Sequence, residues 1–226
     1  MCGRFTLFAP GDVLAAMFGI DEAPSLAPRY NIAPSQPVAA ARVSPDSNNR
    51  EITFLRWGLV PSWAKDPAVG DRMINARAET VSEKPSFRSA FRRRRCLVPA
   101  DGFFEWKRAE GKKQPYYIRF RDCRPFSIAS LWERWEGSDG SVLESCGLIT
   151  TAANDVVSPI HDRMPVILAP KDYGLWLDPA VQDKDALLPL LGAFPADDMT
   201  AFPVRLQVNN PKVDTLACID PMAEIQ

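Results

Sequence analysis

Short apolar runs separated by Gly, Pro, Asp or Ser make up much of the chain. The runs are rich in β-branched and aromatic residues, a pattern typical of β-strands. We predict strands at residues 38–43, 51–57, 96–98, 103–107, 115–120, 126–132, 143–151, 166–168 and 202–208.

Helical patterns are fewer. One is predicted over residues 13–18, after a Pro-Gly-Asp opening and before Gly19, and others over 86–95 and 183–191. Because strands do not alternate regularly with helices, the pattern disfavours a parallel α/β sheet. We expect an α+β fold with one β-rich domain, residues 1–226.

Composition is that of an ordinary globular protein, with 46% hydrophobic and 24% charged residues in 226. Apolar runs stay below the roughly 18 residues that a membrane span needs. The N-terminus lacks the basic start and apolar core of a signal peptide. We therefore expect a cytoplasmic protein.

The cysteines and the histidine limit which disulfides and metal sites the chain can form. Five cysteines without a C-x-x-C spacing favour neither a disulfide framework nor a thiolate zinc site. His161 is the only histidine, so a site with two histidine ligands is excluded. We expect no metal and no cofactor.

Charge is distributed unevenly along the chain. Residues 1–125 hold 21 Lys and Arg against 13 Asp and Glu, a balance of +8, whereas residues 126–226 hold 6 against 15, a balance of −9. Such asymmetry indicates nucleic-acid contact. The alternative is that both halves interleave in one fold and their charges pair.

Cys2 becomes the N-terminal residue if Met1 is removed. It would then carry an amine and a thiol on adjacent carbons, and this pair condenses with an aldehyde to a Schiff base and then to a thiazolidine ring. Arg4 would favour the neutral amine and the thiolate, and Phe5 and Leu7 would anchor the segment. The alternative is a chance cysteine on a frayed tail.

Glu105 lies among aromatic residues in the sequence Asp101-Gly102-Phe103-Phe104-Glu105-Trp106. Desolvation by these rings would raise the pKa of its carboxyl toward neutrality, as a general acid requires. The alternative is a surface glutamate on the wet face of an edge strand.

Three further residues fit the same chemistry. Asn75 could hold a reacting oxygen, Arg77 a phosphate, and His161 could move protons with Asp162 and Arg163 beside it. Alternation places Asn75 and Arg77 on one side of a strand, together with Glu79. A turn asparagine, a surface ion pair and a structural histidine remain as alternatives.

An arginine run at 92–95 and three tryptophans, Trp57, Trp63 and Trp106, also permit nucleic-acid contact. The preferred interpretations are a solvated helix end for the arginines and ordinary core packing for the tryptophans.

Six motifs occur together in one order, and they carry a resemblance that none carries alone. They are Met1-Cys2-Gly3-Arg4-Phe5, Arg29-Tyr30-Asn31-Ile32-Ala33-Pro34, Trp57-Gly58-Leu59-Val60-Pro61-Ser62-Trp63, Asn75-Ala76-Arg77-Ala78-Glu79-Thr80, Asp101-Gly102-Phe103-Phe104-Glu105-Trp106 and His161-Asp162-Arg163-Met164-Pro165. From residue 2 to about residue 213 the chain resembles the SRAP family, the SOS-response-associated peptidases or abasic-site processing proteins.

The resemblance implies a barrel-like β-rich domain with a positive groove, and covalent capture of abasic sites in single-stranded DNA. It implies that Cys2 is the nucleophile, Asn75 holds the sugar oxygen, Glu105 is the general acid and base, and His161 makes the crosslink reversible. It assigns phosphate contacts to Arg4, Arg77 and Arg163. It assigns to Trp63 the role of stacking against a base. Family members are also considered peptidases that expose their own Cys2. This chemistry needs no metal and no cofactor. We leave the oligomeric state open, with a monomer as the default, and expect association with the nucleoid when the protein is bound to DNA.

One position departs from the pattern, since Arg205 stands where the resemblance leads us to expect serine. Two other function classes stay open. An N-terminal-nucleophile thiol amidohydrolase would use Cys2 against amides, with Asn75 as an oxyanion contact. A non-enzymatic single-strand-binding module would use the same arginines and tryptophans and would not need Cys2.

Overall fold

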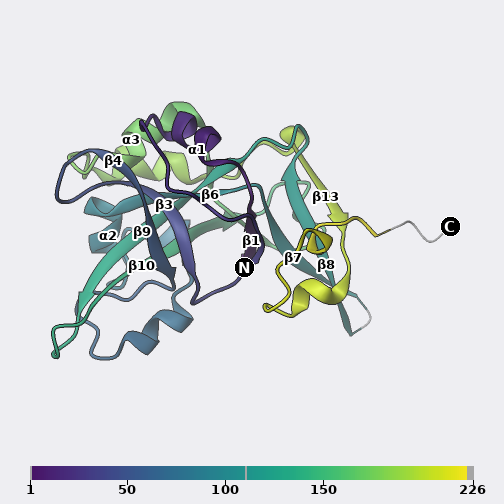
Figure 1. Ribbon diagram of the computed structural model, residues 1–226, viewed down its shortest axis with the longest axis horizontal. Coiled ribbons are helices and arrows are strands. Elements are labelled where there is room, and N and C mark those ends of the chain that lie inside the picture. The colour runs from purple at the N-terminus through teal and green to yellow at the C-terminus, as the bar shows by residue number, and fades with distance from the viewer. Residues whose placement is uncertain (1, 110, 223–226) are drawn as a thin grey trace.

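A closed ring of strands forms the larger part of the fold (Figure 1). In the computed structural model, which describes residues 2–109 and 111–222, each strand of the ring pairs with the next and the last pairs with the first. In pairing order the ring consists of β10 (Val142–Ala152), β4 (Arg50–Trp57), β3 (Pro37–Val43), β6 (Arg95–Ala100) and β9 (Phe126–Glu136). Strands β10 and β4 are parallel and the other pairs antiparallel, so the ring is a mixed barrel, and the predicted barrel-like core is confirmed.

Three short strands attach to the rim of this barrel. They are β5 (Asn75–Arg77) and β11 (Arg163–Pro165), which both pair with β10, and β12 (Ile167–Leu168), which pairs with β9. Strand β10 thereby holds two chain segments that are far apart in sequence, one on each side of its C-terminal end.

A second sheet lies beside the barrel and is antiparallel throughout. Its strands, in order, are β13 (Met199–Pro203), β8 (Lys112–Phe120), β7 (Gly102–Ala109), β1 (Arg4–Leu7) and β2 (Arg29–Ile32). In Figure 1, β1 lies at the centre of the molecule, between the barrel on the left and β7, β8 and β13 on the right. The N-terminal strand therefore lies where the two sheets meet.

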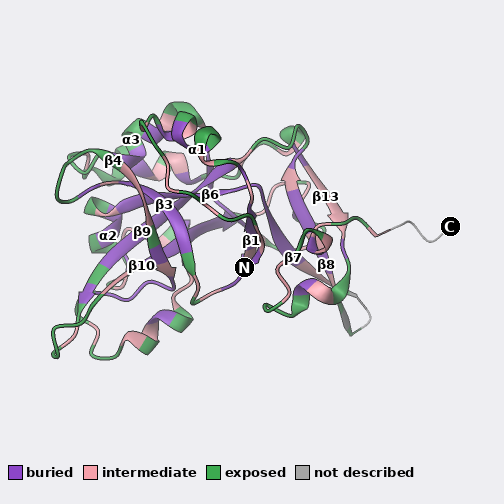
Figure 2. Cartoon of the chain, in the orientation of Figure 1, coloured by how far each residue is buried: buried purple, intermediate pink, exposed green. Residues whose placement is uncertain are grey.

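Burial follows the strands, and the exposed residues gather in loops and on the outer sides of the helices (Figure 2). The main apolar cluster takes side chains from both sheets, including Phe5 and Phe103 at their junction. A smaller cluster, in which Phe104 and Tyr117 meet Val208, attaches the C-terminal segment to β7 and β8.

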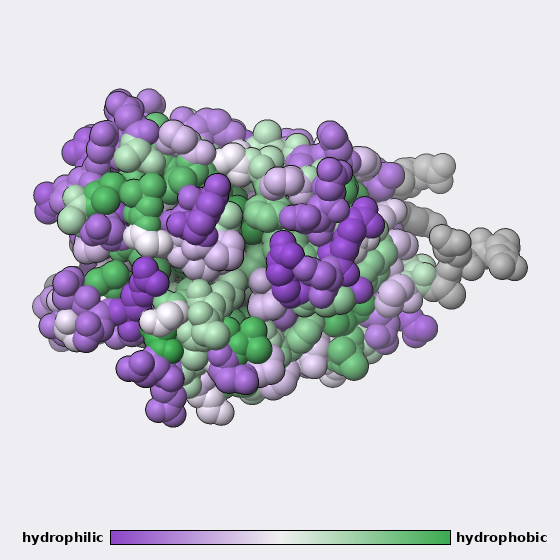
Figure 3. Space-filling view, turned by 90° about the horizontal axis from the view of Figure 1, so that it is seen from above, coloured by the Kyte–Doolittle hydropathy of each residue, from purple (hydrophilic) through white to green (hydrophobic). Residues whose placement is uncertain are grey.

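The helices are short and lie outside the sheets. They are α1 (Gly11–Phe18), α2 (Arg88–Arg93), α3 (Tyr173–Leu177) and α4 (Lys184–Leu187). Turns of 3-10 helix occur at Pro67–Arg72, Ala78–Thr80, Pro170–Asp172, Leu188–Leu191, Ala196–Asp198, Leu206–Asn209 and Leu216–Cys218. Seen from above, the molecule shows apolar side chains between groups of hydrophilic ones (Figure 3). None of the helices in the described ranges is long and apolar enough to cross a membrane.

Most predicted elements are present, with three differences. The helix expected over 86–95 ends at Arg93, because Arg95 belongs to β6 and its buried guanidinium donates to backbone carbonyls, including those of Phe91 and Trp176. The strand expected over 202–208 ends at Pro203, and a 3-10 turn follows. The sequence patterns did not predict β1, β2, β11 or α3, and β5 was expected only through the alternation of Asn75 and Arg77.

Candidate functional site

Strand pairing brings the N-terminus to Glu105. In the β1–β7 ladder, Arg4 lies opposite Phe104 and Phe5 opposite Phe103. Continuing this antiparallel register by one residue places Gly3 opposite Glu105. Cys2 therefore reaches the acidic side chain through backbone pairing.

Cys2 is fully buried, so the segment is anchored and not frayed. Burial raises the pKa of its thiol, and the negative charge of the Glu105 carboxylate raises it further. The expectation that Arg4 would favour the thiolate is wrong for this structure, because the Arg4 guanidinium turns to the Val208 carbonyl, 2.6 Å away. The buried thiol thus stays protonated, and its proton must be removed for attack.

Glu105 lies on an inner strand of its sheet, since β7 is flanked by β8 and β1, and it is 2% exposed. The alternative of a surface glutamate on an edge strand is therefore excluded. Burial raises the pKa of the carboxyl to about 7, as the aromatic flanks predicted, and the nearby charge of Asp162 acts in the same direction. Near neutral pH this group both donates and accepts a proton readily.

His161 faces Glu105, with its Nε2 4.0 Å from Oε2 of the carboxyl. On the other side of the ring, Nδ1 accepts the backbone N–H of Arg163 at 3.0 Å and lies 2.9 Å from Oδ1 of Asp162. Nδ1 therefore has a donor and an acceptor within reach, so both neutral tautomers find a partner. Burial lowers the pKa of His161, which keeps the ring neutral at pH 7 and suited to exchange a proton with Glu105.

Asn75 fixes the N-terminal residue from the barrel side. Its Nδ2 donates to the Cys2 carbonyl at 2.8 Å, across 73 residues of sequence. Its Oδ1 is buried and has no hydrogen-bond partner among the described residues. A buried amide oxygen without a partner is destabilising, so this atom is suited to accept a hydrogen bond from a bound group.

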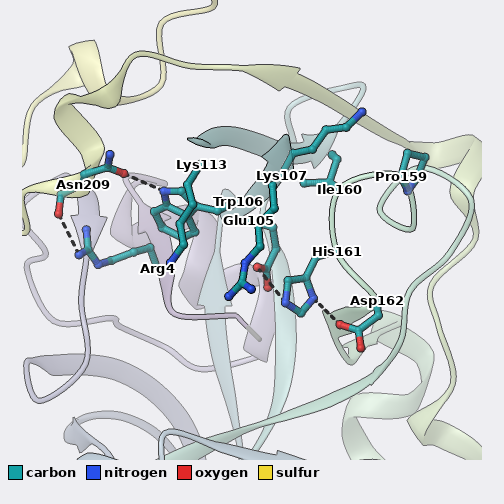
Figure 4. A pocket seen from close by; sticks show the side chains of 11 residues that line it. Arg4, Glu105, Trp106, Lys107, Lys113, Pro159, Ile160, His161, Asp162 and Asn209 are labelled. Atoms are coloured by element: carbon teal, nitrogen blue, oxygen red, sulfur yellow. Dashed lines mark hydrogen bonds and ion pairs between the residues drawn. The ribbon is translucent and has the colours of Figure 1, made fainter. Parts of the chain in front are cut away.

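Glu105 and His161 help to line a cavity of about 830 Å³ (Figure 4), whereas Cys2 and Asn75 are not among its lining residues. Strands β7 and β8 form one wall, and the segment from Pro159 to Asp162 forms the other. The basic lining residues are Arg4, Lys107, Arg108 and Lys113, against the acidic Glu105 and Asp162. This surplus of positive charge suits an anionic ligand.

A three-residue contact shapes the inner wall of the cavity. Nε1 of Trp106 donates to the Asn209 side chain at 2.7 Å, and Arg4 donates to the Asn209 carbonyl at 3.4 Å (Figure 4). The Arg4 guanidinium also lies 6.0 Å from the centre of the Trp106 ring. The C-terminal segment thus holds Arg4 and Trp106 in place.

The remaining predicted DNA contacts lie in different surroundings. Arg77 ends β5 and is exposed, and Trp63 is 63% exposed. Arg163 instead forms a bidentate ion pair with Glu79 at 2.5 and 2.9 Å and also donates to the Thr150 carbonyl. Glu79 lies on a 3-10 turn, so the predicted alternation with Asn75 and Arg77 ends at Arg77. Phosphate binding by these arginines stays a prediction.

Sequence reasoning missed the cations of the β7–β8 wall and Asn209 as site residues. Lys107, Arg108 and Lys113 carry no motif, and only strand pairing across the hairpin brings them to one cavity. Their signal in the sequence is the basic balance of the first half of the chain. Within the described ranges, no three His, Cys, Asp or Glu side chains converge as metal ligands would.

Comparison with known proteins identifies the family. Residues 1–211 match the family described as SOS response associated peptidase (SRAP). The chain is 46% identical over 216 residues to the abasic site processing protein YoqW of Bacillus subtilis (strain 168), covering 94% of this chain and 96% of that protein. It is 32% identical over 270 residues to the abasic site processing protein HMCES of Mus musculus, covering 98% of this chain and 76% of that protein.

The fold has solved counterparts as well. A crystal structure of a protein from Bacteroides thetaiotaomicron superposes with a TM-score of 0.87 at 28% identity, covering 98% of this chain and all of that one. The expected resemblance is thus confirmed in sequence and in fold, and the chain belongs to the SRAP family.

Proposed function

We propose that this protein processes abasic sites in single-stranded DNA by capturing them covalently through Cys2. The observation that carries the proposal is the convergence of buried Cys2 with Glu105, which lines a basic cavity. The names of its relatives as abasic site processing proteins support the same substrate.

The proposed reaction starts once Met1 is removed and the Cys2 amine is free. The amine adds to the aldehyde carbon of the ring-opened abasic sugar, and loss of one water gives a Schiff base. The thiol then loses its proton, its sulfur adds to the same carbon of the protonated Schiff base, and a thiazolidine ring with a neutral nitrogen closes. One water is released for each adduct, and no oxidant, reductant or metal is consumed.

Side chains of the site supply the proton transfers. Protonated Glu105 gives a proton to the departing hydroxyl, and its carboxylate then accepts the thiol proton, which its pKa of about 7 permits in both directions. His161, 4.0 Å away, takes up and returns this proton, and it assists the reverse reaction. Asn75 holds the Cys2 carbonyl and offers its unpartnered Oδ1 to the sugar or to the ring nitrogen.

DNA is held outside this centre. We assign phosphate contacts to Arg4, Arg77 and Arg163 and base stacking to Trp63. Arg4 has N–H groups left beyond its bonds to Asn31 and the C-terminal segment. Arg163 reaches a phosphate only by sharing or exchanging its partner Glu79.

Exposure of the Cys2 amine is part of the proposal. Hydrolysis of the Met1–Cys2 bond, by the chain itself or by a separate peptidase, produces the reactive N-terminus. The family description as a peptidase is consistent with the first route.

The test uses untagged protein and single-stranded DNA with one abasic site. After denaturing electrophoresis we expect a shifted band that survives heat and detergent, with intact single-stranded DNA and duplex DNA as controls. Mass spectrometry of the adduct gives the sum of the two masses minus one water. No band from protein shown to lack Met1 contradicts the proposal, and peptide hydrolysis by that protein would then favour the thiol amidohydrolase.

A further inference from the structure

Three cations line the outer part of the cavity, beyond the reacting groups. Lys107 and Arg108 lie on β7 and Lys113 lies on β8, and we call these three residues the basic strip. Figure 4 shows Lys107 and Lys113 on the wall that also carries Trp106 and Glu105. The strip therefore continues the site outward along the hairpin.

The charges of the strip are not neutralised within the described ranges, where none of its side chains forms a hydrogen bond or an ion pair. Elsewhere the protein pairs its partly buried arginines, as with Arg42 and Glu144 or Arg94 and Glu133. The strip is thus a set of uncompensated cations facing a cavity.

Strand pairing makes this arrangement unfavourable for the protein alone. Arg108 lies directly opposite Lys113 in the β7–β8 ladder, so these two side chains share one face of the hairpin, whereas Lys107 lies on the face that carries Glu105. Like charges opposite each other in a sheet destabilise it. An anion bound between them would remove this repulsion.

The position of the basic strip relative to Cys2 and Glu105 defines which anion fits. Lys107 is two residues from Glu105 along the strand, or about 7 Å at the rise of a β-strand. A ligand captured at Cys2 and continuing outward as a charged chain therefore passes the strip. A DNA strand carries a phosphate at every nucleotide and has this form.

We infer that Lys107, Arg108 and Lys113 form a phosphodiester-binding subsite for the nucleotides that flank the captured residue on one side. The inference rests on the proposed function, because it places the abasic residue at Cys2. It adds three side chains to the DNA contacts assigned above and gives the strand a direction from Glu105 toward the β7–β8 turn.

The test compares two triple variants that remove the same charge. One is Lys107→Ala/Arg108→Ala/Lys113→Ala, and the matched control is Arg88→Ala/Arg92→Ala/Arg93→Ala, whose arginines are exposed on α2 at the barrel end of the molecule (Figure 1). Adduct formation is measured against DNA concentration and salt, with flanking nucleotides on both sides, on the 5′ side only or on the 3′ side only. Thermal melting verifies that both variants fold.

For the strip variant we expect the half-saturating DNA concentration to rise about tenfold or more. The slope of log affinity against log salt should fall by about 2, since each lost phosphate contact on a single strand contributes about 0.7. The difference from the unmodified protein should vanish with DNA that lacks one of the two flanks. A variant that keeps the charges, Lys107→Arg/Arg108→Lys/Lys113→Arg, should bind nearly normally.

Three results would overturn the inference. These are an unchanged half-saturating concentration, an equal rise in the α2 control, and a rise that persists with either flank removed. If the unmodified protein forms no adduct, the proposed function fails instead, and non-covalent binding of the same DNA, followed by fluorescence anisotropy, still tests the strip.

Discussion

The inner and outer ends of the cavity differ in burial and in charge. At the inner end, Cys2 is fully buried and Glu105 is 2% exposed, and both are fixed by strand pairing. At the outer end, Arg108 and Lys113 are exposed and form no ion pair among the described residues. Burial tunes proton transfer and exposed charge attracts DNA, so we expect changes at the two ends to have separable effects.

The largest effect is expected from Cys2→Ala. The variant keeps an N-terminal amine and can form a Schiff base, but no sulfur is available to close the ring. The heat-stable adduct should fall to the background seen with intact DNA, while salt-sensitive binding persists. Denaturing electrophoresis and anisotropy measure the two properties, and a normal adduct yield from this variant would rule out the mechanism.

Glu105→Gln is expected to slow adduct formation by about 100-fold or more, because the general acid and base is lost. The rate of the unmodified protein should change around pH 7, where the carboxyl titrates, and the variant should lack this change. Single-turnover rates at saturating DNA between pH 5 and 9 provide the measurement. An equal loss of non-covalent affinity would show that the residue is structural.

The same substitution should stabilise the fold at high pH. Between the ordinary pKa of 4.5 and the folded-state pKa of about 7, the folded chain retains a proton that the unfolded chain has lost. The free energy of unfolding therefore falls as pH rises through this range. The fall is about 1.4 kcal/mol for each pH unit and about 3 kcal/mol in total. Melting curves should show a larger gain for Glu105→Gln at pH 8 than at pH 5.

His161→Ala should slow reversal of the adduct by about tenfold or more and its formation by less. The histidine assists Glu105 and has partners for both of its tautomers, so its loss removes a second proton carrier from ring opening. Transfer of preformed adduct to excess competitor DNA gives the reverse rate. Equal slowing in both directions would argue against this role.

The smallest effect is expected outside the cavity, from Trp63→Ala. Loss of one stacked base is worth about 1–3 kcal/mol, so the half-saturating DNA concentration should rise about tenfold. Phe54→Ala is the control, since Phe54 is also an exposed aromatic, at 52%. A similar rise for both variants would indicate that Trp63 has no specific contact with DNA.

Local sequence predicted the inner end better than the outer end. The aromatic flanks of Glu105 predicted its desolvation, and the residues after Cys2 predicted an anchored N-terminus; burial in the structure confirms both. The predicted effect of Arg4 on the thiol was wrong, because its guanidinium donates to the Asn31 side chain and to backbone carbonyls 204 and 205 residues away in the chain. Residue type indicates what a group needs, but not which distant partner supplies it.

Sequence alone was sufficient for the β-rich class, most strand positions and the reactive residue types, because these depend on local patterns and on side-chain chemistry. The tertiary structure was needed for everything that depends on distance. Closure of the barrel brings Asn75 to the Cys2 carbonyl, the β1–β7 ladder brings the N-terminus to Glu105, and the β7–β8 hairpin assembles the basic strip. Pairing between segments far apart in sequence is set by the packing of the whole chain, and no local pattern encodes it.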